Sequence, residues 1–200
     1  MLVACIDMEG VLIPEMWPYI AERTGISALA LTTREVPDYQ SLVERRIELL
    51  SYHKKKLSDI QNIVAELEPY EGARLFLSKM SQKCQVVLVS DAFYELVKPL
   101  WEKLGSPNIE CHHFTVDANQ NILAARYSRK GKHEVVERFK KRGFNTLAVG
   151  DAFNDIGMLN AADKGFLFRP SVETLNAAQN LPIAVQYDEI LLASEPRSFD

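Results

Sequence analysis

The sequence predicts an α/β fold, in which a doubly wound, Rossmann-like parallel sheet carries a small helical cap inserted after the first strand. Short apolar runs at residues 2–6, 86–89 and 146–149 have the composition of strands that are buried on both faces of a sheet. Helical segments separate the later runs, as crossover connections between parallel strands require. Residues 15–70 contain no clear strand, which indicates a helical insertion.

The chain is expected to divide into a cap and a core, at residues 14–70 and at residues 1–13 with 71–200. In the cap, Thr24-Gly25 is a typical helix end, and apolar residues at helical spacing predict a helix over 38–53. Ser58 resembles the capping-box start of another helix.

In the core, helices and strands alternate. In chain order, we expect a helix over 72–81, the strand 86–89, a helix over 94–104, a β-hairpin over 109–127 with its turn at 117–120, a helix over 132–142, the strand 146–149, and short strands at 165–168 and 184–185.

Composition narrows the classes of function. The chain has 200 residues, enough for one domain with a modest insertion, and its formal charge of −4 argues against a nucleic-acid partner held by bulk electrostatics. No apolar stretch approaches the roughly 20 residues of a membrane helix, and no signal peptide is expected. The cysteines Cys5, Cys84 and Cys111 are widely spaced, which favours free thiols in a reducing cytoplasm.

Three predicted strands end in polar residues that belong to one edge of the sheet. Asp7-Met8-Glu9-Gly10 follows the first strand, Ser90-Asp91 the second, and Gly150-Asp151 the third, with Asp155 four residues further on. Because ligands bind at the carboxyl ends of strands in open α/β sheets, we expect these side chains to face one reacting centre. Residues two apart in an extended segment point to the same side, so the two acids of the first motif can act together.

The order and spacing of these motifs resemble the haloacid dehalogenase superfamily of phosphohydrolases, and within it the phosphoserine phosphatase branch. That superfamily has an Asp-x-Asp nucleophile loop, a strand-end Ser or Thr, a Lys, and a Gly-Asp-x-x-x-Asp loop, and it places its first type of cap where the insertion is expected here. More narrowly, the Asp-x-Glu-Gly-Val variant and the stretches 33–39 and 90–95 resemble the bacterial bifunctional phosphoserine phosphatase/homoserine phosphotransferases. The resemblance covers nearly the whole chain.

The resemblance implies Mg²⁺-dependent chemistry through an aspartyl-phosphate. Asp7 would be the nucleophile, and a hard cation would bridge this carboxylate and the phosphoryl group. Lys132 would add positive charge beside both groups, although Lys130 competes for this role from the sequence alone. The expected metal site comprises Asp7, Asp151 and the backbone carbonyl of Glu9. Asp155 would either hydrogen-bond to this site without contacting the ion or bind the ion through a water.

Glu9 departs from the superfamily pattern, which commonly has Asp at this position as the acid for the leaving group and then the base for the attacking water. Glu keeps this chemistry but adds a methylene, which moves the carboxyl group by roughly an ångström. We hypothesise that the change favours a wider choice of acceptor, so that phosphoryl transfer to an alcohol competes with hydrolysis.

The resemblance also implies a substrate, O-phosphoserine, with water or homoserine as acceptor. Glu15 would bind the ammonium group and Arg46 the carboxylate; the alternative for Arg46 is a helix-surface charge paired with Glu44 or Glu48. Asn154 would bind substrate or phosphate, or would simply favour a turn. The expected substrate-binding residues are Glu15, Arg46, Ser90, Asp91 and Asn154.

Other functions stay open at this point. One is a phosphatase of another small phosphomonoester. A phospho-acceptor signalling module is a different class, against which the helical insertion and the nucleophile on the first strand argue. A binding protein without catalysis is a third, against which the complete set of acids and the lysine argues. The sequence does not reveal the physiological acceptor or whether the chain forms a homodimer.

Overall fold

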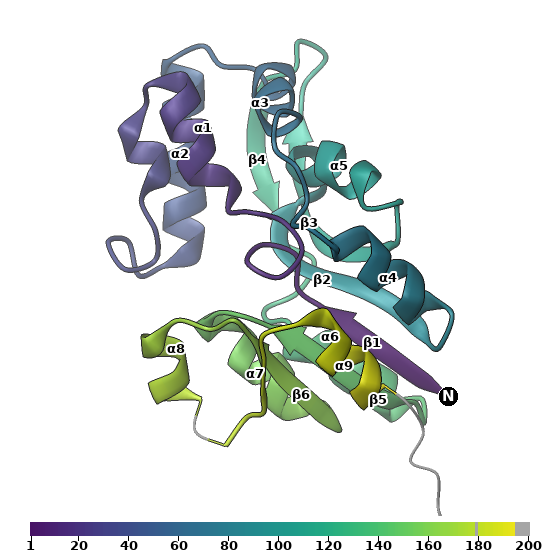
Figure 1. The fold of residues 1–200 in the computed structure, drawn as a ribbon. Coiled ribbons are helices and arrows are strands. Elements are labelled where there is room, and N and C mark those ends of the chain that lie inside the picture. The colour runs from purple at the N-terminus through teal and green to yellow at the C-terminus, as the bar shows by residue number, and fades with distance from the viewer. Residues whose placement is uncertain (179, 195–200) are drawn as a thin grey trace, which may run out of the picture.

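The computed structural model describes residues 1–178 and 180–194, and its centre is one sheet. The strands are β1 (Leu2–Ile6), β2 (Gln85–Phe93), β3 (Asn108–Val116), β4 (Ile122–Arg126), β5 (Asn145–Gly150), β6 (Lys164–Phe168) and β7 (Ile183–Ala184). Their order across the sheet is β4-β3-β2-β1-β5-β6-β7 (Figure 1). All neighbours pair in parallel except β3 and β4, which form the predicted hairpin. The predicted α/β class is confirmed.

Alternating side chains of the buried strands face two helical layers. The core helices are α4 (Ala73–Ser81), α5 (Tyr94–Lys103), α6 (His133–Lys141), η2 (Phe153–Asp155), α7 (Ile156–Ala161), α8 (Val172–Ala177) and α9 (Tyr187–Ala193). Val3 and Cys5 of β1 pack with the layer that contains α6 and α7, whereas Ala4 and Ile6 pack with the layer of α4, α5 and α9. This alternation follows from the two-residue period of a strand, and it makes the sheet doubly wound.

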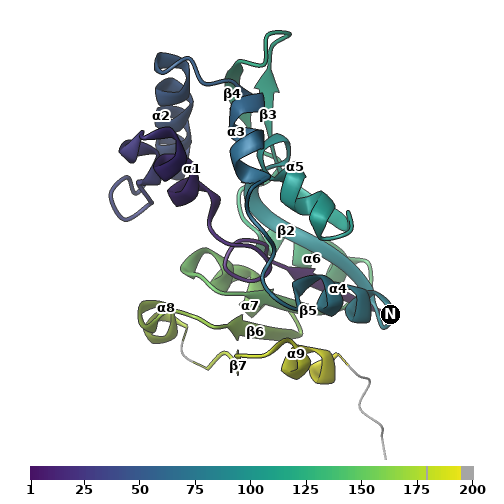
Figure 2. The same ribbon diagram turned by 45° about the horizontal axis from the view of Figure 1, so that its top comes forward.

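The segment between β1 and α4 is helical, as predicted, and it contains α1 (Met16–Thr24), η1 (Ser27–Ala30), α2 (Tyr39–Tyr52) and α3 (Leu57–Val64). Figures 1 and 2 show these helices on one side of the sheet, joined to it by the loop that follows β1. The N–H of Tyr70 donates to the carbonyl of Leu12 (2.9 Å), so the two connections to the core lie side by side. The cap boundaries at 14 and 70 stay a prediction.

Several boundaries differ from the sequence expectations. Ser90 and Asp91 lie within β2, which runs on to Phe93, because polar residues can remain extended at a strand end; the pairing with β3 shifts register between Val89 and Phe93. Helix α3 begins at Leu57, and the carboxylate of Asp59 accepts from the N–H of Lys56 (2.8 Å). The prediction that Ser58 is the N-cap residue of this helix was therefore wrong.

The three helices after residue 155 were not predicted. α7, α8 and α9 have only six, six and seven residues, too few for a helical period to be read with assurance. No helix in the described part of the chain is long and apolar enough to cross a membrane. Cys5, Cys84 and Cys111 are free thiols, as expected.

The contact between α7 and β6 gives a prediction about stability. A Cβ atom added at Gly165 in β6 would lie 2.3 Å from the backbone oxygen of Leu159 in α7. Since backbone cannot move aside as a side chain can, we expect Gly165→Ala to lower the free energy of unfolding by about 1–3 kcal/mol in denaturant titrations.

Gly157→Ala is the matched control. Its Cβ would meet no atom closer than 3.9 Å, and it lies in α7, where Ala is favoured over Gly by up to ~1 kcal/mol. We expect this variant to be as stable as the parent or more stable. Equal effects of the two substitutions would contradict the close approach of helix and strand.

Candidate active site

The first motif forms a tight loop at the end of β1. The N–H of Asp7 still donates to the carbonyl of Val149 in β5 (2.9 Å), which holds this residue at the sheet edge. The chain then turns, and the carbonyl of Met8 accepts from the N–H groups of both Leu12 (2.7 Å) and Ile13 (3.0 Å). The loop after β1 is therefore supported by backbone hydrogen bonds on both sides of Asp7.

Two glycines allow this loop and the one after β5 to meet. Gly10 has a φ of +77°, and a Cβ there would lie 2.1 Å from Oδ2 of Asp151. A Cβ at Gly150 would lie 2.4 Å from Cβ of Asp155, whose Oδ2 accepts from the N–H groups of Asp151 (3.0 Å) and Ala152 (3.1 Å). Asp155 thus holds the second loop, and Asp151 lies directly against the first one.

Lys132 lies between two buried carboxylates. Its Nζ is 2.7 Å from Oδ1 of Asp7 and 2.7 Å from Oδ1 of Asp155. Burial alone would lower the pKa of Lys132, but the two carboxylates outweigh it and raise the pKa well above its ordinary value. Burial and the Asp155 charge raise the pKa of Asp7, and Lys132 opposes them. Lys130 is exposed, so it is Lys132 and not Lys130 that contacts Asp7 in the structure.

Three carboxylates at this edge lie close enough together that they could hold a cation. Asp7, Asp151 and Asp155 each offer an oxygen, and these atoms lie within 4.8 Å of one another. One ammonium group faces the three acids, and burial together with Asp155 raises the pKa of Asp151 to about 7. The donors are all oxygen and carry uncompensated negative charge, which fits a hard divalent cation such as Mg²⁺.

Glu9 links the loop after β1 to the cap. Its Oε1 accepts from the N–H of Met16, the first residue of α1 (2.9 Å), so this carboxylate is directed at the cap helix and does not join the acid cluster. Burial, with the charge of nearby Glu15, raises the pKa of Glu9 to about 8. A carboxyl group with such a pKa holds a proton near neutral pH, as an acid for a leaving group must. Glu15 itself is exposed at the start of α1.

Ser90 and Asp91 lie side by side at the end of β2. The hydroxyl oxygen of buried Ser90 accepts from the N–H of Ala92 (3.1 Å), which leaves its proton for another acceptor. The Asp91 carboxylate accepts from Nη2 of Arg129 (2.9 Å) and from Nδ2 of Asn154 (2.9 Å). Although burial alone would raise it, Lys132 and these two donors lower the pKa of Asp91.

Arg46 of α2 points inward rather than along the helix surface. It is 6% exposed, its Nη2 donates to the carbonyl of Leu31 (2.7 Å), and its guanidinium lies 4.4 Å from the ring centroid of Trp17. Burial lowers its pKa to about 10. Its Nε has no hydrogen-bond partner in the described residues, and no pair with Glu44 or Glu48 forms there. The surface alternative for Arg46 is thereby excluded in this structure.

The sequence missed two side chains that join this site. Tyr39, the first residue of α2, donates its hydroxyl to the backbone carbonyl of Asp91 and so connects the cap to β2. Arg129 follows β4 and binds both Ser90 and Asp91. Tyr39 lies in the stretch 33–39, where the resemblance was a signal, whereas nothing in the sequence near Arg129 distinguishes it from a loop cation.

His112 of β3 lies beside the same group. Its Nδ1 accepts from the N–H of Ser128 (3.1 Å), which places the ring proton on Nε2, 3.8 Å from Oδ1 of Asp91. The ring is 4% exposed. Burial and the Arg129 charge lower the pKa of His112 to about 4, against the opposing effect of Asp91.

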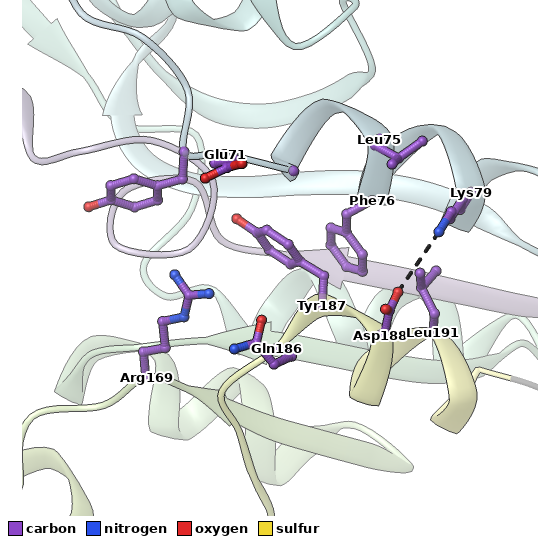
Figure 3. Close-up of a pocket in the computed structure, with 11 residues that line it drawn as sticks. Glu71, Leu75, Phe76, Lys79, Arg169, Gln186, Tyr187, Asp188 and Leu191 are labelled. Carbon is purple, nitrogen blue, oxygen red and sulfur yellow. Dashed lines mark ion pairs between the residues drawn. The ribbon is translucent and has the colours of Figure 1, made fainter.

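A separate cleft of about 550 Å³ lies between α4 and α9 (Figure 3). Phe76 and Tyr187 stack in its wall with ring centroids 4.7 Å apart, and Arg169 lies beside them. The hydroxyl of Tyr187 donates to the carbonyl of Val11 (2.6 Å), which connects α9 to the loop after β1. The described lining residues include neither the clustered acids Asp7, Asp151 and Asp155 nor Ser90 or Lys132, so this cleft is separate from the acid cluster.

Comparison with known proteins identifies the family of this chain and several relatives. A model of the family described as haloacid dehalogenase-like hydrolase matches residues 1–163. The chain is 39% identical over 191 residues to "Phosphoserine phosphatase ThrH" of Pseudomonas aeruginosa, which covers 95% of this chain and 93% of the relative. It is 39% identical over 189 residues to a phosphoserine phosphatase of Pseudomonas syringae pv. tomato, with 94% and 80% covered.

Solved structures show the same fold. An apo phosphoserine phosphatase superposes with a TM-score of 0.76 at 22% identity, covering 95% of this chain and 97% of the other. A phospho-aspartyl intermediate analogue of phosphoserine phosphatase gives 0.75 at 21% identity, with 96% and 97% covered.

The lowered pKa of His112 predicts how the free energy of unfolding changes with pH. Because the folded pKa of about 4 lies below the ordinary 6.5, the unfolded chain binds a proton between these values that the folded chain does not. The stability contributed by neutral His112 is present above about pH 6.5 and is lost as the pH falls toward 4. The lowered pKa already contains the electrostatic effects of the charged and titratable neighbours of this ring, which are Arg129, Asp91, His113 and Lys132.

We expect His112→Asn, whose side-chain oxygen can still accept from Ser128, to lose less stability on acidification than the parent. The difference should be on the order of 2 kcal/mol between about pH 7.5 and about pH 5, measured by urea titration at each pH. Parallel stability curves for parent and variant would contradict the neutral state of the histidine.

Proposed function

This chain belongs to the haloacid dehalogenase-like hydrolase family and is a phosphoric monoester hydrolase, and on that basis we propose that it hydrolyses O-phosphoserine with Mg²⁺ through an aspartyl-phosphate on Asp7. The carrying observation is the placement of the Asp7 carboxylate beside both Lys132 and the Asp151 carboxylate. Both Pseudomonas relatives are named phosphoserine phosphatases, and they match more than nine-tenths of this chain.

The first step would form a bond between Asp7 Oδ2 and phosphorus while the bond from phosphorus to the serine oxygen breaks. Oδ1 is held by Lys132 and by the N–H of Met8 (2.7 Å), while Oδ2 accepts no hydrogen bond from the described residues and can attack. Glu9 would give its proton to the departing serine oxygen. Ser90 would donate to a phosphoryl oxygen, and Lys132 would offset the charge of the incoming phosphate.

The second step would release phosphate. Glu9, now a carboxylate, would take a proton from water as the water oxygen attacks phosphorus, and the bond between phosphorus and Asp7 would break. The proton returns Glu9 to its starting state, so the cycle consumes one water and one phosphomonoester.

The residues present fit Mg²⁺. Asp7, Asp151 and the backbone carbonyl of Glu9 would hold the ion, which would supply positive charge that lets a carboxylate approach a phosphoryl group. Asp155 has one oxygen on Lys132 and the other on two backbone N–H groups. It would therefore support the ligands from behind rather than bind directly.

The cap would select the amino acid. Arg46 is buried, is held by Leu31 and Trp17, and keeps an unpaired Nε, so it would bind a substrate carboxylate. Glu15, close enough to act on the pKa of Glu9, would bind the ammonium group. Asn154 would approach the phosphate from the loop after β5. A different small phosphomonoester is the competing substrate, and release assays over phosphorylated amino acids decide between them.

Homoserine as an acceptor is a further part of this proposal. Its support is the resemblance in the first motif and in the stretch 33–39, together with Glu9 in place of the common Asp. We also propose a cytoplasmic location, where three free thiols would remain reduced.

The nucleophile and the metal give the central test. We expect Asp7→Asn to lower phosphate release from O-phosphoserine by ~10³-fold or more, because the amide cannot form the acyl phosphate. Chelation should abolish release by the parent, and added Mg²⁺ should restore it. Asp188→Asn, which changes an exposed acid of α9, is the control and should keep full activity.

Substantial turnover by Asp7→Asn would contradict the proposal. A single-turnover experiment separates the signalling alternative, because a switch would accumulate phosphate on Asp7 without releasing it. Activity toward other phosphomonoesters but not toward O-phosphoserine would support the proposed reaction through Asp7 and contradict O-phosphoserine as the substrate.

Glu9→Asp tests the choice of acceptor. The shorter side chain withdraws the carboxyl group by roughly an ångström, which can change a rate by ~10²-fold when a reacting group is misplaced. With O-phosphoserine and homoserine both supplied, we expect the ratio of phosphohomoserine to free phosphate to fall about tenfold. The two products are separated by chromatography, and an unchanged ratio would count against a role for Glu9 in acceptor choice.

A further inference from the structure

Arg129 is a buried cation at the reacting edge for which the proposed chemistry has no role. Its side chain is 4% exposed. Nη2 donates to the backbone carbonyl of Ser90 (2.6 Å) and to Oδ1 of Asp91 (2.9 Å), while Nη1 donates to the carbonyl of Glu110 (3.2 Å). One guanidinium therefore binds both residues of the Ser90-Asp91 pair and the strand beside them.

The backbone at this point needs such a support. In the pairing of β2 with β3, Val89 is opposite Glu110 and Phe93 is opposite His112, so residues 90–92 have one residue of β3 opposite them. Strand pairing is disrupted across such a bulge, and its carbonyl groups need other donors. Arg129 bridges Ser90 of β2 and Glu110 of β3 where the ladder is interrupted, because its planar fork can reach both strands.

Asp91 carries this support to the other motifs. Its Oδ2 accepts from Asn154 in the loop after β5, and the same oxygen lies 4.0 Å from Nζ of Lys132. Both of its carboxylate oxygens thus face donors of the protein. The chain Arg129–Asp91–Asn154 connects the strand end that carries Ser90 to the loop that carries the metal-site acids.

We infer that Arg129 is a positioning residue for phosphoryl transfer, which acts through Asp91 and the backbone of Ser90 to hold the Ser90 hydroxyl in line with Lys132 and the loop after β5. Asp91 belongs to this support rather than to the substrate contacts expected for it. The inference rests on the proposed role of Ser90 as a phosphoryl ligand, and it holds for any phosphomonoester that the enzyme accepts.

The test compares Arg129→Met, Arg129→Lys and Asp91→Asn, with p-nitrophenyl phosphate as a second substrate beside O-phosphoserine. We expect Arg129→Met to lower kcat about 100-fold with KM within about twofold, since misplacement of a transition-state contact by an ångström has this effect. The kcat of Arg129→Lys should be about tenfold higher than that of Arg129→Met, because lysine keeps the positive charge but lacks the planar guanidinium group.

A double-mutant cycle shows whether Arg129 acts through Asp91. Asp91→Asn alone should lower kcat about tenfold or more, whereas adding it to Arg129→Met should cost less than about threefold further. Arg138→Met is the matched control, because Arg138 of α6 pairs with the half-buried side chain of Glu110 in β3, and no hydrogen bond or ion pair of Arg138 with Ser90 or Asp91 is present in the described residues. It should leave kcat and KM unchanged.

The outcomes that overturn the inference are specific. A folded Arg129→Met or Arg129→Lys enzyme with the parent's kcat would show that Arg129 only stabilises the fold, and the lysine variant decides alone if the methionine variant does not fold. A rise in KM with unchanged kcat in Asp91→Asn would return Asp91 to the substrate contacts. Loss of O-phosphoserine activity in the parent, with p-nitrophenyl phosphate still hydrolysed, would reject the proposed substrate but leave this test intact.

Discussion

The active edge of this protein depends on the ammonium group of Lys132 between the carboxylates of Asp7 and Asp155. Two buried acids this close repel each other, and neither could stay ionised without a cation beside it. The 2.7 Å contacts of Nζ with both acids join the start of α6 to β1 and to the loop after β5. Asp151 completes the cluster without an ammonium partner of its own, and this leaves the negative charge that a divalent cation would neutralise.

The second constraint is the close approach of the loops after β1 and β5, which is possible because Gly10 and Gly150 have no side chains. Any Cβ at Gly10 would occupy the space of the Asp151 carboxylate, and any Cβ at Gly150 that of Asp155. These glycines decide where the acids lie, whereas Lys132 decides whether they can be charged there. The motif spacing therefore encodes a packing requirement as well as a set of reactive groups.

The sequence predicted the parts of the site that strand ends determine. Asp7 and Asp151 could be placed together because parallel strands deliver their carboxyl ends to one edge. Lys132 lies at the start of α6 and not at a strand end, so it was predicted only from the family resemblance. Arg129 could not be found in this way, since its role comes from an interruption in the pairing of β2 with β3 that no local pattern reveals. The extension of β2 through Ser90 to Phe93 was missed because polar residues indicate a strand end locally, whereas in the structure they remain extended.

The identity of residue 9 also has a structural reason that the sequence alone did not give. Its carboxylate reaches from the loop after β1 to the N–H of Met16, at the positive end of α1, where a negative group is favoured. An Asp at this position is one methylene shorter and would give up part of that reach. Tyr39 makes the second link, from α2 to the carbonyl of Asp91. These two of the cap–core contacts end on residues of the first and second motifs, so the geometry of the proposed acid and of the Ser90-Asp91 pair depends on where the cap lies.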